Sequence, residues 1–347
     1  MKLLHPTLSS EELDHLERLK DKASSAAKIR VENQVALDGM QLPIYSFEFG
    51  TGGSKVPTIV FIGGVHGIEV IGTQVVLSFM ETLCELLSWD EATHHMLSKM
   101  RVLFYPIANP GGMALGTRSN PKGVDLMRNA PIDAADLNPA FIMGGHRLSS
   151  MLPWYRGKAT DCLELEADTL CNFIRRELWE TPFSIVLDVH SGFGAHDRVW
   201  FPFASNKKLF PKVAEMMQLK ELLDRTFPHH VYHIEPQNSQ YRTHGDLWDY
   251  LYLQHEKETK AGTFLPLCLE MGSWAWVKKN PGQLISSLGI FNPILPHRQA
   301  RILRRHHPFL DFLVRATSAY SQWADITDGL RHKLNNQAQS LWYKKTA

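Results

Sequence analysis

Apolar runs of strand length recur along the chain, and segments with helical periodicity separate them. A continuous apolar run of this length is typical of a strand that is buried on both faces of a sheet. We expect such strands at 56–64, 100–112, 182–194, 198–204 and 263–274, and an alternating strand at 42–52. The periodicity and capping residues predict helices after Ser9 and Ser10, at 71–89, at 166–178 and in the tail from 297.

Buried strands that alternate with helices predict an α/β fold, here a three-layer sandwich with a mixed, largely parallel central sheet. We expect residues 1–39 to form an N-terminal helical segment packed on the core and 40–296 to form the catalytic domain. Residues 297–347 would add a C-terminal helical segment to that domain. The stretch 123–157 has little periodicity but many apolar residues, which indicates a functional loop rather than disorder.

Composition and charge narrow the range of partners. The chain has 347 residues and a formal net charge of +1, so we expect no nucleic-acid partner and no membrane partner. The four cysteines show no CxxC spacing, which predicts reduced, structural thiols. The N-terminus lacks a secretory apolar region and no run of 18 apolar residues is present, so we expect a cytoplasmic location.

Polar residues stand at the ends of the predicted strands, where sites of open α/β sheets collect. His66 and Glu69 follow the first buried run on a glycine turn, and Asp188 and His190 end the third. A catalytic zinc ion takes three protein ligands and leaves one position for water. His66, Glu69 and His190 would form such a set. Asp188 would then be an outer carboxylate that orients a ligand, and a structural hydrogen bond to a loop is an equally open role for it. Taken alone, His66 is more typical of a surface or structural residue than of a metal ligand.

Other polar residues in apolar or irregular surroundings extend this candidate site. Glu270 stands inside an apolar run, where it serves either as a general base beside a metal or as the partner of a core arginine. Arg118 and Arg128 follow the second strand and are suited to polarise a carbonyl or to clamp a carboxylate. Surface roles for both arginines remain open at this stage. Tyr241 lies in a polar, aromatic loop before a helix, where closing over a substrate and packing are both available roles.

The motifs GGVHGIE, ANPGGM, GVDLMRN, LDVHSG, YRTHGDLWDY and LEMGSW follow one another in this order. As an ordered set they resemble the zinc carboxypeptidase family, in particular its branch near the succinylglutamate desuccinylase and aspartoacylase-like deacylases. The resemblance covers about residues 40–290 and implies an α/β sandwich around a mixed sheet. It implies that His66, Glu69 and His190 bind one zinc ion and that Glu270 is the general base.

The same resemblance implies that Arg118 polarises the scissile carbonyl and that Arg128 binds a terminal carboxylate of the substrate. Tyr241 stands near the place of the family's mobile tyrosine. In one departure from the family, Met127 occupies the position of an asparagine before Arg128, and a methionine cannot donate a hydrogen bond to a carboxylate. Asn129 or Asn138 would have to compensate, or carboxylate recognition is altered. In the loop that follows, His146, Arg147 and Arg156 are further candidates for substrate contacts, although surface roles are more typical of such residues.

The sequence therefore predicts a zinc-dependent hydrolase of an amide bond, a metallocarboxypeptidase that acts on a small peptide. An N-acyl amino acid deacylase is the first alternative, and a non-catalytic binding protein on the same fold is the second. A serine hydrolase has little support, because the sequence around Ser191 lacks the GxSxG order.

Overall fold

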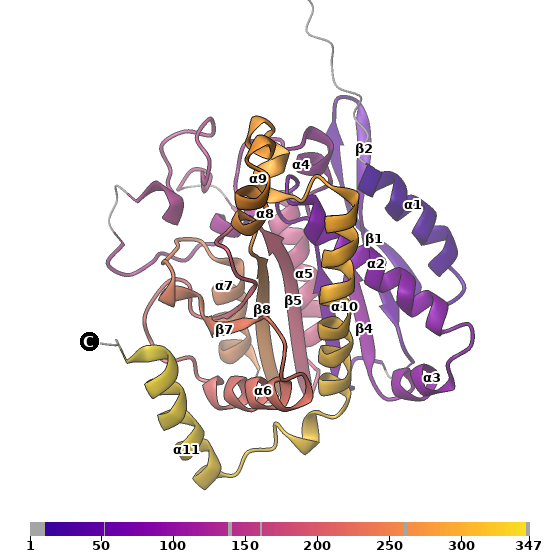
Figure 1. The fold of residues 1–347 in the computed structure, drawn as a ribbon, viewed down its shortest axis with the longest axis vertical. Helices are drawn as coiled ribbons and strands as arrows, with labels where there is room; N and C mark the ends of the chain where they lie inside the picture. The colour runs from indigo at the N-terminus through magenta and orange to yellow at the C-terminus, as the bar shows by residue number, and fades with distance from the viewer. Residues whose placement is uncertain (1–10, 52, 138–140, 160–161, 260–261, 345–347) are drawn as a thin grey trace, which may run out of the picture.

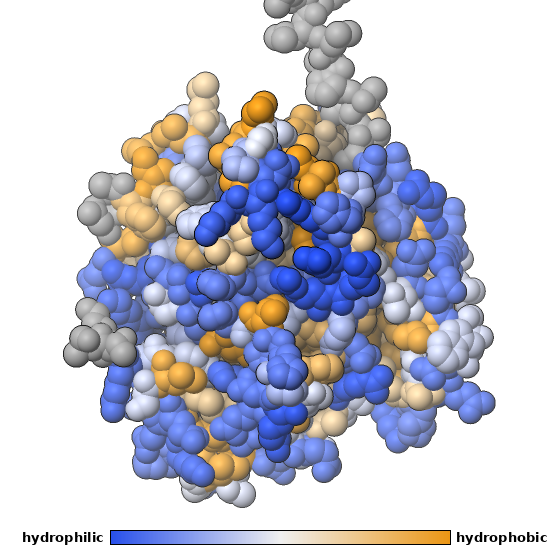
Figure 2. Space-filling model, in the orientation of Figure 1, coloured by the Kyte–Doolittle hydropathy of each residue, from blue (hydrophilic) through white to orange (hydrophobic). Residues whose placement is uncertain are grey.

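The computed structural model describes residues 11–51, 53–137, 141–159, 162–259 and 262–344 (Figure 1). The expected helix cap at Ser9 and Ser10, and Asn138, lie outside these ranges. Figure 2 shows a largely hydrophilic face, with apolar residues gathered toward the end of the molecule where α8 and α9 lie in Figure 1.

An eight-stranded mixed sheet forms the centre of the fold, in the order β1-β2-β4-β3-β5-β8-β6-β7. Its strands are β1 (Lys28–Leu37), β2 (Met40–Phe49), β3 (Thr58–Ile62), β4 (Arg101–Tyr105), β5 (Phe183–Ser191), β6 (Arg198–Phe201), β7 (His233–Pro236) and β8 (Thr263–Met271). The pairs β3–β4, β3–β5, β5–β8 and β6–β7 are parallel, and the other three are antiparallel. The predicted fold class is thus confirmed.

Helices cover both faces of this sheet. They are α1 (Glu11–Ala23), α2 (Val70–Leu86), α3 (Glu91–Leu97), α4 (Pro110–Leu115), α5 (Leu165–Leu178), α6 (Val213–Thr226), α7 (Leu247–Glu258), α8 (Trp274–Lys279), α9 (Ser287–Phe291), α10 (Pro296–Ser318) and α11 (Asp328–Ala338). Figure 1 shows α2 and α10 in front of the sheet and α5 and α7 behind it, while α6 packs against α11.

The apolar runs form the core because every residue of β3, β4 and β5 is buried. Phe61 of β3 packs edge-on against Phe79 of α2, with ring centroids 5.2 Å apart, and lies 5.4 Å from Phe104 of β4. Such aromatic pairs add to the free energy gained from apolar burial alone. The four cysteines are unpaired, as the sequence predicts.

The connections place a topological switch point between β3 and β5. From β3 the chain crosses through α2 to β4 on one side, whereas β5 leads toward β6 on the other side of the sheet. In open α/β sheets the crevice outside such strand ends is where ligands bind. The segments that carry His66, Glu69 and His190 leave the sheet at this crevice.

Three expected elements differ from the structure. Residues 28–37 of the expected helical segment form the edge strand β1, which pairs along its length with β2. Asp38 and Gly39, both at positive φ, make the two-residue turn of that hairpin. Asn109 caps the short helix α4 by accepting from the Gly112 N–H at 2.8 Å, where a turn was expected. The C-terminal helix ends at Ser318, well before the end of the apolar pattern.

No single helix in the described ranges is long and apolar enough to cross a membrane. The pair α2 and α3, bent by 110° at the break between them, passes the same test of length and composition when taken together.

Gly67, between the predicted ligands His66 and Glu69, allows the turn that carries them to touch α4. A Cβ atom at Gly67 would lie 2.1 Å from the backbone C of Gly112 and from the backbone N of Met113. We therefore expect Gly67→Ala to lower the free energy of unfolding by about 1–3 kcal/mol, because rigid backbone cannot yield to the added methyl group. Urea unfolding of the purified protein measures the change.

The matched control is Gly329→Ala on α11, where a Cβ atom would meet nothing within 4 Å. Alanine at a compatible helical position stabilises a protein by about 0.4–1 kcal/mol. The two substitutions should therefore act in opposite directions, and an equal effect of both would contradict the packing account.

Candidate metal centre and active-site cavity

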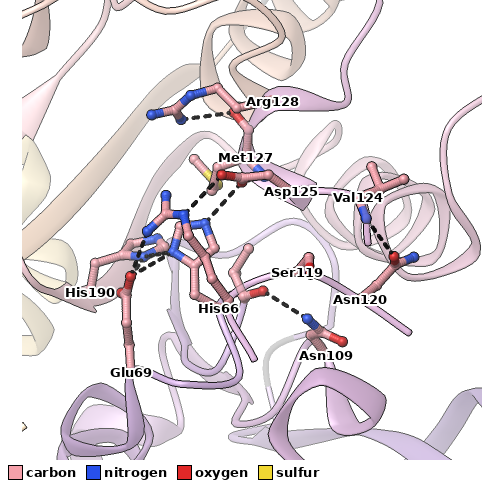
Figure 3. Close-up of polar contacts among 12 residues, drawn as sticks. His66, Glu69, Asn109, Ser119, Asn120, Val124, Asp125, Met127, Arg128 and His190 are labelled. Atoms are coloured by element: carbon pink, nitrogen blue, oxygen red, sulfur yellow. Dashed lines mark hydrogen bonds and ion pairs between the residues drawn. The ribbon is translucent and has the colours of Figure 1, made fainter. Parts of the chain in front are cut away.

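Three predicted ligands meet at the carboxyl ends of β3 and β5 (Figure 3). His66 Nδ1 lies 2.8 Å from Glu69 Oε1, and His190 Nδ1 lies 3.0 Å from Glu69 Oε2. The two Nδ1 atoms are only 3.1 Å apart. All three side chains are buried, and their ligand atoms form a group suited to one metal ion.

The outer nitrogens of both histidines contact carboxylates. His66 Nε2 lies 3.0 Å from Asp125 Oδ1, and His190 Nε2 lies 2.7 Å from Asp188 Oδ2. An ionised carboxylate only accepts hydrogen bonds, so each Nε2 carries a proton and a neutral ring keeps its lone pair on Nδ1. Two lone pairs and a carboxylate oxygen then face one another in a buried space. This donor set fits a divalent cation of the zinc type.

The electrostatics of the ion-free cluster agree with a cation site. Burial opposes the charged form of His190, yet Asp188 and Glu69 hold its pKa well above the usual value. Burial likewise opposes the charge on Glu69, but His66 and His190 hold the pKa of this carboxyl below its usual range. Positive charge is thus favoured at the place where the ligand atoms converge.

The two outer carboxylates are themselves fixed. Asp188 also accepts a hydrogen bond from the Trp248 indole N–H at 2.9 Å. Asp125 accepts from the Met127 N–H at 3.1 Å. Sequence reasoning missed Asp125, although a carboxylate in the apolar GVDLM stretch was a usable signal. Because both carboxylates are fixed, they hold the two histidine rings in one orientation.

Glu270 stands on β8 directly beside His190, which is its partner in the β5–β8 register. Its carboxylate accepts a hydrogen bond from the Phe193 N–H at 2.9 Å. Burial, together with the negative charge of Glu69, raises the pKa of Glu270 to about 8. Within the described ranges no arginine forms an ion pair with it, which removes the alternative of a core salt bridge.

A cavity of about 420 Å³ opens over the metal-ligand cluster. Its charged lining consists of the cluster, Glu270, Arg118 and Arg128. Most of the remaining wall is apolar or aromatic, with side chains that include Met127, Met143, Trp154, Phe193, Trp200, Tyr241, Ile290 and Phe291. A mostly apolar cavity with a few convergent charged groups is the usual form of a small-ligand site.

The zinc carboxypeptidase family model matches residues 27–272. The chain belongs to the zinc carboxypeptidase family. Zinc is therefore the ion that His66, Glu69 and His190 would hold, and the predicted membership of the zinc carboxypeptidase family is confirmed.

Among curated proteins, carboxypeptidase E of Caenorhabditis elegans is 35% identical over 112 residues, which cover 28% of this chain and 24% of that protein. The rat carboxypeptidase N catalytic chain is 30% identical over 115 residues, again 28% of this chain and 24% of the relative. The match thus spans only about a quarter of the length of these relatives.

Solved structures of family members share the fold. Carboxypeptidase A from Helicoverpa armigera superposes with a TM-score of 0.63 at 17% identity, covering 90% of this chain and 74% of that one. Bovine thrombin-activatable fibrinolysis inhibitor, solved with tick carboxypeptidase inhibitor, gives a TM-score of 0.62 at 15% identity. That alignment covers 95% of this chain and 99% of the bovine chain.

The two arginines of this family member differ in their partners. Arg118 donates to Glu69 Oε1 at 3.0 Å and to Asp125 Oδ2 at 2.9 Å, so it is bound to the metal-ligand cluster. Arg128 donates to two backbone carbonyl groups, those of Met127 at 3.2 Å and Met143 at 3.4 Å, and it also interacts with the Tyr241 hydroxyl group. Both guanidinium groups line the cavity.

The structure does not bring Asn129 into the cavity. Its side chain donates to the Arg156 carbonyl at 3.1 Å and accepts from the Glu164 N–H at 2.7 Å. Both ends of the amide are thus used to brace the loop, which corrects its expected role as a substrate contact. Tyr241 does line the cavity and packs against Phe193, with ring centroids 5.3 Å apart.

The loop after Arg128 covers the site with apolar side chains rather than with its charges. Met143, Pro153 and Trp154 line the cavity. The polar residues expected there brace the loop instead: His146 contacts the Pro153 carbonyl, Arg147 the Gly157 carbonyl, and Arg156 the Arg128 carbonyl. These three residues are not among the described residues that line the cavity.

Asp188→Asn tests the support of the metal site. An amide in place of the carboxylate weakens the orientation of His190, so we expect zinc affinity to fall about 10–100-fold. Competition with a zinc-binding dye measures the dissociation constant. Asp224→Asn is the matched control. Asp224 lies on α6, outside the cavity, and its Oδ1 atom lies 2.8 Å from Nε2 of His230. Unchanged affinity in Asp188→Asn would contradict the orienting role.

Proposed function

We propose that this protein is a metallocarboxypeptidase that hydrolyses the last peptide bond of a peptide. The observation that carries the proposal is Arg128, a buried guanidinium group beside the metal-ligand cluster. No carboxylate of the described residues forms an ion pair with it, although a buried charge is costly without a partner. A substrate's terminal carboxylate supplies that partner in a two-pronged geometry.

The other groups supply the remaining functions of the reaction. Bound zinc, held by His66, Glu69 and His190, supplies a Lewis acid at the end of the cavity. Glu270 takes a proton from the attacking water on its carboxylate and passes it to the departing amine. Arg118, at the same end, donates N–H groups toward the oxygen that gains negative charge.

Carboxylate recognition in this chain differs from the family pattern at Met127. Its side chain lines the cavity next to Arg128 and offers no hydrogen-bond donor. With Asn129 committed to the loop, Arg128 is left to bind the carboxylate without help from either neighbour. This supports a tolerant site in which charge, more than a network of hydrogen bonds, holds the substrate end.

No observation specifically favours the alternative function, an N-acyl amino acid deacylase. An N-acyl amino acid also carries a carboxylate, so Arg128 alone does not separate the two substrate classes. The family match and the curated relatives, which carry carboxypeptidase names, support the peptide. Ser191 Oγ contacts no base among the described residues, which disfavours a serine hydrolase. A cytoplasmic location stays a prediction.

Glu270→Gln tests the proton-transfer role. We expect kcat on a C-terminal peptide substrate to fall about 10²–10⁴-fold, because the amide cannot accept the proton of the attacking water. Zinc content of the purified variant should equal that of the wild type. Glu256→Gln, on the exposed side of α7, is the control with unchanged kcat. Wild-type turnover by a zinc-loaded Glu270→Gln protein would exclude the role.

Arg128→Met tests the recognition of the terminal carboxylate. Loss of one partner of a buried charge pair costs about 2–4 kcal/mol, so kcat/KM should fall about 30- to 1000-fold. A peptide with an amidated C-terminus should be a poor substrate of the wild type and should lose little more in the variant. Arg147→Met in the same loop is the control. An equal loss on free and amidated peptides would contradict carboxylate binding by Arg128.

A further inference from the structure

Exposed apolar side chains are concentrated in two short segments. Of twenty large hydrophobic residues that are exposed in the described ranges, ten lie in 142–152 or 274–294. Three of them are largely exposed to solvent: Ile285 is 95%, Met151 92% and Leu148 74% exposed. Single exposed apolar residues are ordinary, but a gathering of this kind marks a binding surface. We call the exposed apolar residues of these two segments the apolar rim.

The apolar rim is continuous with the wall of the cavity. The first segment, with the two residues after it, supplies Met143, Pro153 and Trp154 to the cavity lining, and the second supplies Ile290 and Phe291. A substrate that enters the cavity therefore meets apolar side chains from the metal-ligand cluster outward. Figure 2 shows apolar residues at the end of the molecule where α8 and α9 lie, and on the side of the neighbouring loop.

The second segment is anchored to the site rather than loosely attached. The Asn292 side chain accepts from the Ile71 N–H at 2.9 Å and donates to the Ile68 carbonyl at 2.8 Å, beside Glu69. Trp274 donates to the Gly192 carbonyl at 3.0 Å, just after His190. These bonds tie the apolar rim to both metal-ligand strand ends and hold its position relative to the cluster.

Charge on the two segments excludes one kind of ligand. Residues 142–152 and 274–294 contain no aspartate or glutamate, and their charged residues are Arg147, Lys278 and Lys279. A cationic chain gains nothing here, whereas an apolar chain can bury its surface at about 25 cal/mol for each Å² removed from water. The ligand of this surface is therefore apolar and neutral or anionic.

We propose that the apolar rim binds the part of the substrate upstream of the scissile bond, and that preferred substrates carry apolar groups there. The proposal rests on the proposed function. Arg128 holds the terminal carboxylate inside the cavity, so the rest of the chain leaves through the mouth and crosses the apolar rim. Apolar side chains of a peptide and a fatty acyl group on its N-terminus present the same chemistry to this surface.

The experiment measures the activity of the zinc-loaded protein on three substrates that share one C-terminal dipeptide. One substrate has an upstream segment of serine and glutamine, one of leucine and phenylalanine, and one an N-dodecanoyl group. We expect kcat/KM to be about tenfold higher for either apolar substrate, given the area that Ile285 and Met151 can cover. Comparison of the leucine and phenylalanine substrate with the dodecanoyl substrate distinguishes a preference for apolar side chains from a preference for an acyl chain.

The double variant Ile285→Ser, Met151→Ser should remove this preference and leave turnover of the polar substrate unchanged. Both residues are almost fully exposed, so the fold should tolerate serine; a thermal melt checks this. Leu253→Ser on α7, at a residue that is 44% exposed outside the two segments, is the control. Equal kcat/KM for polar and apolar substrates, or a preference that survives in the double variant, would overturn the proposal.

Two further readouts keep the outcomes distinct. Calorimetric binding of the three peptides to Glu270→Gln reports the apolar rim without turnover, and failure of every peptide to bind would overturn the proposed function as well. Sedimentation with phosphatidylcholine vesicles and sedimentation velocity report other occupants. Vesicle binding or self-association that the double variant loses, without any substrate preference, would assign the surface to a membrane or a second copy and overturn the proposal.

Discussion

Two imidazole nitrogens and one carboxylate oxygen point at a common place because the far sides of both rings are already committed to carboxylates. Positive charge is favoured between them, since Asp188 and Glu69 hold the pKa of His190 well above its usual value even without a metal ion. The rest of the site serves to keep this arrangement. The switch point of the sheet brings β3 and β5 together, Gly67 packs the ligand turn on α4, and Asp125 and Asp188 fix the rings.

Burial without a partner separates the two arginines of the cavity. Arg118 is balanced by Glu69 and Asp125, so it belongs to the resting site. Arg128 is buried among backbone carbonyls, so its charge is only partly compensated until an anion arrives. Binding of an anionic group to Arg128 relieves the free-energy cost of its buried charge, and this relief favours substrate binding. The distances from each guanidinium group to the nearest carboxylates, and not the residue type, distinguish the two arginines.

The sequence predicts the central strands well because β3, β5 and β8 are buried on both faces, which leaves a continuous apolar signal. It misses β1, an edge strand with a mixed pattern, although the Asp38-Gly39 turn marks the hairpin. The metal ligands could be predicted from their order along strand ends. The direction of Asn129 could not, because two backbone groups distant in sequence decide where its amide points.

Asp188 serves two elements through one oxygen. The same Oδ2 atom contacts the His190 ring and accepts from the Trp248 indole, which stands in the first turn of α7. The loop with Tyr241 leads directly into that helix. One buried oxygen atom is therefore shared by the ring of a predicted metal ligand and by the helix that follows Tyr241, so both elements depend on the same carboxylate.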